Sequence, residues 1–140
     1  MDSKTSGITV RKITPYDYND LQEAISKDSY HRDTTTPEFF YEPETLGFVY
    51  GDEEGTILWL RISSTLDKIA RLDIQFRRNK AARRNKAAMD WGFPILCEHA
   101  KKGGYKAFVF DSVSPHLIKY CTSQLGFKQE KNNILRKELN

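Results

Sequence analysis

The sequence predicts a single α+β domain over residues 1–140, with a mixed, mostly antiparallel sheet flanked by helices. Runs that alternate apolar and polar residues, typical of strands, recur from residue 8 to residue 139. Segments with apolar residues at helical spacing lie between some of these runs, whereas short turn sequences join the others. Hairpin strands mixed with crossover helices predict this class rather than a purely parallel sheet.

The first part of the chain predicts a strand, a helix and a loop. Residues 8–13 alternate as a strand does, and Thr14-Pro15-Tyr16-Asp17 has the N-cap, proline and acid of a helix start. The apolar stripe of that helix is Leu21, Ala24 and Ile25. We expect a loop over residues 31–37 and a short helical turn over residues 38–41.

The middle of the chain predicts three strands. Residues 46–52 and 56–63 flank the turn Glu53-Glu54-Gly55, and residues 68–76 follow the next turn. The third strand has a two-sided pattern. One side carries Ala70, Leu72, Ile74 and Phe76, and the other carries Arg71, Asp73 and Gln75.

The last third predicts a helix, a strand, a helix and two short strands. The first helix would bury the stripe Ala88, Trp91, Ile95 and His99 and stop at residues 101–104, and Pro94 predicts a kink or a division into two pieces. A strand follows over residues 105–110. A helix begins at Ser114-Pro115 and ends near residues 125–127, and two strands share residues 127–139.

Composition excludes several classes of protein. Hydrophobic residues make up 39% and aromatic residues 12%, which argues against disorder. The net charge is +3, so the chain as a whole is not a strongly basic nucleic-acid binder. The two cysteines, Cys97 and Cys121, do not form a disulfide framework and suit a reducing cytosol. No segment has the length of a membrane span, and the first residues lack a signal-peptide core, so we expect a cytoplasmic protein without a membrane partner.

Positive charge is concentrated in a tandem repeat. Residues 77–88 read RRNKAARRNKAA, with six cationic side chains and no acidic one. The segment would bind the phosphates of a cofactor, bind nucleic acid through residues 77–86, or form a solvated helix face. A shift of six residues turns a helix by about 240°, so the two copies do not form one stripe. This, and the absence of interleaved aromatic residues, argues against nucleic acid.

Two stretches resemble the GNAT superfamily of N-acetyltransferases. The stretch SPHLIKYCTSQLGFK, after the strand YKAFVFDS, looks like the family's helix with its apolar-Gly-Phe ending. The unit IARLDIQF, the basic repeat and MDWGFPILCEHAKKGGYK looks like its strand, pyrophosphate loop and long helix. The resemblance covers about residues 45–139 and is greatest to small phage-encoded members. It implies the GNAT-like (acyl-CoA N-acyltransferase) fold and acetyl-CoA as the cofactor.

The resemblance also implies a cofactor site. Backbone N–H groups at a helix N-terminus suit a pyrophosphate, and the family pattern there is Arg or Gln, two residues, Gly, one residue, then Gly or Ala. Here Ala replaces the first Gly, and Met89 or Arg83 occupies the second small position, depending on the copy. Counting back from Gly104 favours the second copy, and counting forward from Phe76 favours the first. The implied cofactor-binding residues are Ile74, Gln75, Phe76, Arg78, Arg83, Arg84, Asn85, Lys86, Ala87 and Ala88.

Three residues are candidates for catalysis. Asp73, on the polar side of the strand before the loop, is the candidate base, and an ion pair with Arg71 is the alternative. Tyr120 lies near the position of the tyrosine that acts as the general acid in the family. Cys121 takes that position if the helix carries one extra residue. Both residues are alternatively part of the core. His31 and His116 have no partner at ligand spacing, so we expect no metal site.

Two functions follow from the resemblance. The first is an acetyl-CoA-dependent N-acetyltransferase that transfers an acetyl group to an amine of a small molecule or protein. The second is a catalytically inactive GNAT-fold protein that acts in binding or structure, for example in a phage virion or against a host factor. A phage-encoded protein would act in the host cytoplasm or in the virion.

Overall fold

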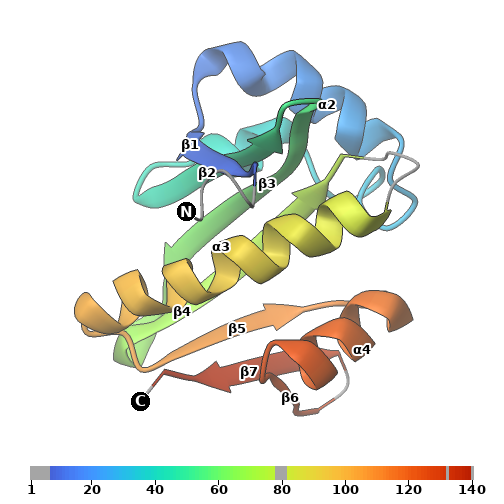
Figure 1. Cartoon of the computed structure of the whole chain (residues 1–140). Coiled ribbons are helices and arrows are strands. Elements are labelled where there is room, and N and C mark those ends of the chain that lie inside the picture. The colour runs from blue at the N-terminus through green and yellow to red at the C-terminus, as the bar shows by residue number, and fades with distance from the viewer. Residues whose placement is uncertain (1–6, 78–81, 132, 140) are drawn as a thin grey trace.

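The structure, a computed structural model, describes residues 7–77, 82–131 and 133–139. These residues form a seven-stranded sheet in the order β1-β2-β3-β4-β5-β7-β6 (Figure 1). The strands are β1 Thr9–Lys12, β2 Thr45–Asp52, β3 Gly55–Ser64, β4 Ile69–Phe76, β5 Ala107–Asp111, β6 Lys128–Gln129 and β7 Ile134–Glu138. Only β4 and β5 pair in parallel among these strands, and the other pairs are antiparallel. The prediction of a mixed, mostly antiparallel sheet is confirmed.

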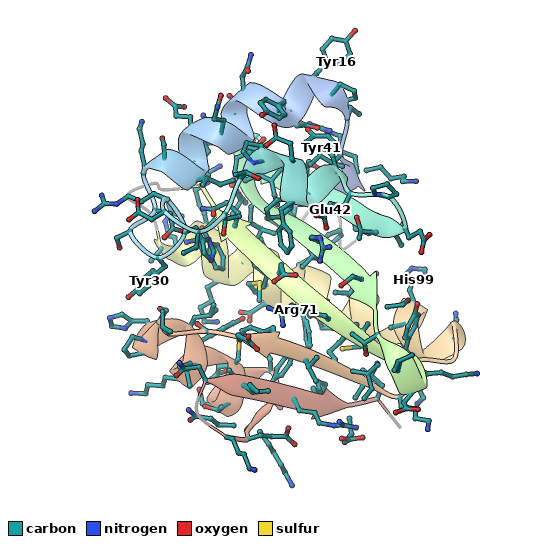
Figure 2. All side chains as sticks on the ribbon, turned by 180° about the vertical axis from the view of Figure 1, so that it is seen from behind. Tyr16, Tyr30, Tyr41, Glu42, Arg71 and His99 are labelled. Carbon is teal, nitrogen blue, oxygen red and sulfur yellow. The ribbon has the colours of Figure 1, made fainter. Side chains whose placement is uncertain are left out.

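Helices cover both faces of the sheet (Figures 1 and 2). The helices are α2 Tyr18–Ser26, α3 Ala82–Lys102 and α4 Pro115–Gln124, and the 3-10 turns are η1 Pro15–Asp17, η2 Pro37–Tyr41 and η3 Leu66–Lys68. On β3, Leu58 and Leu60 pack into the cluster beneath α3 and α4, whereas Trp59 between them packs into the cluster beneath α2 and η2. The predicted order of elements is confirmed.

The first helix begins as its sequence predicts. The Thr14 hydroxyl accepts a hydrogen bond from the backbone of Tyr16, and the Asp17 carboxylate accepts one from the backbone N–H of Thr14. This reciprocal capping satisfies N–H groups that have no partner within the helix. The predicted stripe of Leu21, Ala24 and Ile25 is buried.

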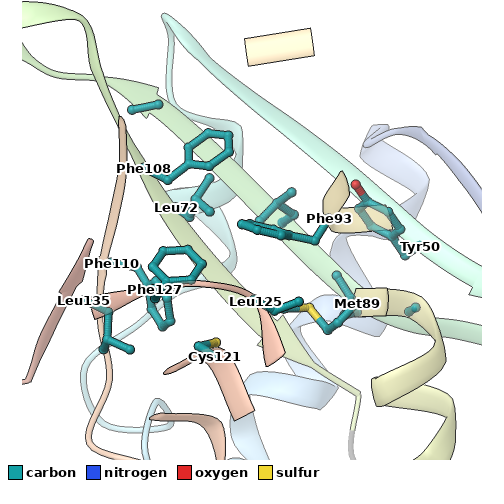
Figure 3. Packing of buried hydrophobic residues seen from close by; sticks show 14 of the residues in the cluster. Tyr50, Leu72, Met89, Phe93, Phe108, Phe110, Cys121, Leu125, Phe127 and Leu135 are labelled. Carbon is teal, nitrogen blue, oxygen red and sulfur yellow. The ribbon is translucent and has the colours of Figure 1, made fainter. Parts of the chain in front are cut away.

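The larger hydrophobic cluster lies between the sheet and helices α3 and α4 (Figure 3). The Phe127 ring packs 5.3 Å from the Phe93 ring and 5.1 Å from the Phe110 ring, centroid to centroid. Phe127 therefore joins the end of α4 to both α3 and β5, which explains why the Leu-Gly-Phe ending of α4 is apolar.

The structure corrects parts of two predictions about α3. The helix runs unbroken through Pro94, so it is not divided into two pieces, and Pro94 lies on its exposed side. Ala88 is buried and Trp91 packs against the cluster, but the predicted stripe was wrong at Ile95 and His99, which are exposed. The buried residues are Ala88, Met89, Gly92 and Phe93.

Gly92 sets the distance between α3 and the sheet. A Cβ atom at this position would lie 2.5 Å from Cε2 of Tyr50, a buried ring of β2. Glycine is therefore required for the close approach of the helix to β2.

Candidate functional site

The sheet opens between its two parallel strands. β4 and β5 pair only from Ile69–Ala107 to Arg71–Val109. Beyond Arg71, the second half of β4 (72–76) has no strand partner on its β5 side among the described residues. The backbone N–H and C=O groups of such an unpaired strand edge are available to an extended ligand.

A cleft of about 900 Å³ lies at this opening. Its walls come from the unpaired half of β4, the segment after α2, the end of β5, the start of α4 and the first turn of α3. The side chains that line it include those of His31, Arg71, Asp73, Asn85, Asp111 and Val113. The cleft therefore joins the polar side of β4 to the beginning of α3.

Asp73 lies in a ladder of alternating charges on the sheet face opposite α3, where Figure 2 shows Arg71 and Glu42. Its Oδ2 atom is 3.2 Å from Nη1 of Arg61, and its Oδ1 atom is 3.3 Å from Nη2 of Arg71. Arg61 is 7% exposed and also contacts Oε1 of Glu42 at 2.7 Å, while Arg71 reaches Asp111 at 3.5 Å. The ion pair between Arg71 and Asp73 is present, and the role of Asp73 as a base stays a prediction.

A second polar group lies two residues along β4. Gln75 is fully buried, and its Oε1 atom is 2.7 Å from Nδ1 of His31. Its Nε2 atom donates to Oδ2 of Asp28 at 3.0 Å and to the carbonyl of Phe76 at 2.8 Å. These bonds hold the segment after α2 against β4. Of the predicted cofactor residues on this strand, Ile74 and Phe76 line the cleft, whereas the Gln75 side chain is used by this network.

The second copy of the basic repeat is helical, since α3 is described from Ala82. Arg84 pairs with Asp52 through two contacts, 2.6 Å and 2.8 Å long, and Lys86 pairs with Asp90 at 2.6 Å. Both cations are therefore engaged by acids, and neither side chain lines the cleft. Arg77, at the end of the strand, is 3.5 Å from Asp20.

The remaining repeat residues differ in position. Asn85 lines the cleft, and its buried Oδ1 atom has no hydrogen-bond partner among the described residues. Arg83 and Ala87 are exposed, and Ala88 is buried in the core. Arg78 lies outside the described residues. The second copy, residues 83–88, lies inside α3; of the first copy, Arg77 follows β4 and Ala82 begins the described part of α3.

Tyr120 and Cys121 lie outside the cleft. The Tyr120 hydroxyl donates to Oδ1 of Asp90 on α3, and burial together with this hydrogen bond raises the pKa of Tyr120 above its ordinary value. Cys121 is fully buried in the larger cluster, and burial raises the pKa of its thiol to about 12. Neither side chain lines the cleft, and the catalytic roles of Tyr120 and Cys121 stay predictions.

The sequence analysis did not identify His31 and Arg61 as site residues. Their partners are distant in sequence: Gln75 lies 44 positions after His31, and Asp73 lies 12 positions after Arg61. No short-range spacing signals such contacts. Within residues 7–77, 82–131 and 133–139, no group of three or more His, Cys, Asp or Glu side chains forms a candidate metal site, and no helix there has the length and apolarity to cross a membrane.

The fold matches solved structures over nearly the whole chain. A GNAT-family acetyltransferase from Staphylococcus aureus Mu50 superposes with a TM-score of 0.72 and 10% identity, covering 95% of this chain and 99% of that one. This chain has the GNAT fold. The same GNAT fold is found in the ribosomal-protein-S18-alanine N-acetyltransferase from Escherichia coli, with a TM-score of 0.71, 12% identity and coverage of 95% and 94%.

A third structure with the GNAT fold is that of yncA from Salmonella typhimurium, solved with its cofactor acetyl-CoA. It superposes with a TM-score of 0.67 and 13% identity, covering 96% of this chain and 95% of that one. No family model and no curated protein matches the sequence. The likeness is therefore one of structure, and it confirms the GNAT-like fold that the sequence predicts.

Proposed function

We propose that this protein is an acetyl-CoA-dependent N-acetyltransferase that transfers an acetyl group to an amine of a small molecule or protein. The observation that carries the proposal is the cleft beside the unpaired half of β4. The two amide groups of the pantetheine arm of acetyl-CoA can pair with such a strand edge as another strand would. The yncA structure, which has the same fold and contains acetyl-CoA, supports this reading.

The residues of the cleft fit this substrate in part. The backbone of residues 72–76 would hold the pantetheine arm, and Asn85 offers an amide that has no partner for its Oδ1 atom in the described structure. The first turn of α3 borders the cleft, and helix N-termini favour anions such as phosphates. Acetyl transfer then requires an uncharged amine and a group that accepts its proton.

Binding measurements test the proposal. We expect acetyl-CoA and CoA to bind in calorimetry and to raise the Tm, because a ligand at 100 times its Kd stabilises the folded state by about 2.7 kcal/mol. Val113→Trp would fill the cleft and weaken binding, whereas Leu46→Trp changes another exposed apolar residue outside it and serves as the control. Absence of binding at about 1 mM acetyl-CoA, the upper end of ordinary KM values, would contradict the proposal.

A second candidate function is that of a catalytically inactive GNAT-fold protein that acts in binding or structure. Arg84 and Lys86, which the resemblance implies as phosphate ligands, are paired with Asp52 and Asp90 and favour this alternative. Under this alternative the protein binds neither acetyl-CoA nor CoA. Neither compound then changes the Tm of the wild type or of Val113→Trp.

A further inference from the structure

His31 occupies the wall of the cleft without belonging to any motif in the sequence. It lies in the segment after α2, and about a third (35%) of its side chain is exposed. The described polar partners of its imidazole ring, Gln75 and Asp28, both contact the Nδ1 atom. The opposite ring nitrogen, Nε2, has no hydrogen bond to any of the described residues.

The hydrogen-bond network determines how the Gln75 amide is oriented. One end of this amide lies within hydrogen-bond distance of the Asp28 carboxylate and of the Phe76 carbonyl. Both are acceptors, so that end must be the NH₂ group. The other end, which faces His31, is therefore the carbonyl oxygen Oε1.

This orientation decides the tautomer of His31. An amide oxygen only accepts hydrogen bonds, so the 2.7 Å contact requires that Nδ1 carries the proton. The Asp28 carboxylate, 3.4 Å from the same Nδ1, favours the same tautomer. In the neutral imidazole, Nε2 then carries a free lone pair.

We propose that Nε2 of His31 is the general base of the acetyl transfer, and that Gln75 and Asp28 are positioning residues that hold its tautomer. The inference rests on the proposed acetyltransferase function. Asp73 is less suited to the role, because its two oxygens are already engaged by two arginines, Arg61 at 3.2 Å and Arg71 at 3.3 Å.

The transfer step balances with the groups named. The amine nitrogen attacks the thioester carbonyl carbon, a C–N bond forms, and the C–S bond breaks to release the CoA thiolate. The amine loses one proton to Nε2 of His31, directly or through one water molecule. The imidazolium then returns this proton, by way of solvent, to the thiolate, which leaves the acetylated amine, CoA and neutral His31.

The inference predicts that transfer falls as the pH is lowered, because a protonated Nε2 accepts no proton. The charged and titratable groups that share the cleft with His31 come from the segment after α2, from β4 and its end, and from β5. They are Lys27, Asp28, Tyr30, Arg71, Asp73, Arg77 and Asp111. Because these groups share the cleft with His31, the pH profile must be compared with that of a variant that lacks the imidazole.

Three measurements on the full chain test the inference. First, ¹⁵N NMR of histidine-labelled protein should show the proton of His31 on Nδ1. Second, acetyl transfer from acetyl-CoA to n-butylamine should fall by about 100-fold in His31→Gln, the low end of the range for general base catalysis, and by less in Asp73→Asn. Third, the loss of activity on the acid side of the pH profile should be present in the wild type and absent in His31→Gln.

The outcomes separate this inference from the proposed function. Calorimetry should show equal binding of acetyl-CoA to the wild type and to His31→Gln. If neither protein binds acetyl-CoA, the proposed function fails. If both bind it and His31→Gln transfers acetyl groups at the wild-type rate, or if NMR shows the proton of His31 on Nε2, the inference is overturned while the proposed function stands.

Discussion

Two polar clusters lie on the same side of β4, and they differ in how their polar groups are satisfied. In the charge ladder around Asp73, each carboxylate contacts at least one arginine, and the central Arg61 is buried. In the network around Gln75, a neutral amide connects Asp28 to His31, and one ring nitrogen is left for a ligand. The carboxylates of the ladder are engaged in ion pairs, whereas the imidazole keeps one ring nitrogen without a described partner, which the proposed proton transfer uses.

The largest loss of stability is expected from a substitution that breaks the charge ladder. Arg61→Met removes the buried guanidinium that contacts Asp73, Glu42 and the carbonyl of Phe39. Leaving these acceptors without their donor should lower the free energy of unfolding by about 3 kcal/mol. Urea denaturation measures this change, with Arg32→Met, at an exposed arginine after α2, as the control. A loss no larger than that of the control would show that the ladder has no structural role.

A smaller loss of stability is expected in the second cluster. Gln75→Leu keeps the approximate volume of the side chain but leaves Asp28 and Nδ1 of His31 without the amide, at a cost of about 1–3 kcal/mol. The same substitution should change the ¹⁵N shifts of the His31 ring in the folded protein. A loss of stability alone would leave these shifts unchanged. Gln22→Leu, on the exposed face of α2, is the matched control and should change stability by at most about 0.5 kcal/mol. If the ¹⁵N shifts of His31 are unchanged in Gln75→Leu, the amide does not position the imidazole.

The smallest effect concerns an ion pair outside both clusters. Arg84 hydrogen-bonds Asp52 and lowers the pKa of its carboxyl below the ordinary value of 3.8. A lowered folded-state pKa adds stability that is complete above pH 3.8 and is lost as the pH falls through the folded-state value. Asp52→Asn should therefore cost about 1 kcal/mol at neutral pH and progressively less in acid.

Thermal unfolding from neutral pH down to about pH 2, well below the ordinary pKa of an aspartate, measures this dependence. Glu53→Gln, an exposed acid in the same turn, is the control and should show a flat difference from the wild type. A stability gap between Asp52→Asn and the wild type that stays constant down to the lowest pH would contradict the assignment of this pair.

The order of elements and the two sides of β4 were predictable from the sequence because both depend on local periodicity. The capping at Thr14, the stripe of α2 and the alternation of Leu72 and Asp73 each involve neighbours a few residues apart. The stripe of α3 was predicted wrongly in its second half, because Ile95 and His99 have helical spacing but are exposed. Which helical face is buried depends on the sheet beneath it, where Tyr50 meets Gly92.

By itself, the sequence determined the α+β class, the order of strands and helices, and the strand and helix that border the candidate site. Only the tertiary structure decided that the second copy of the repeat is helical, that Arg84 and Lys86 are paired with acids, and that His31 lies against Gln75. The physical reason is sequence separation. Secondary structure follows from interactions within a few residues, whereas the position of a charge or an imidazole in a cleft depends on partners brought close only by the packing of the sheet.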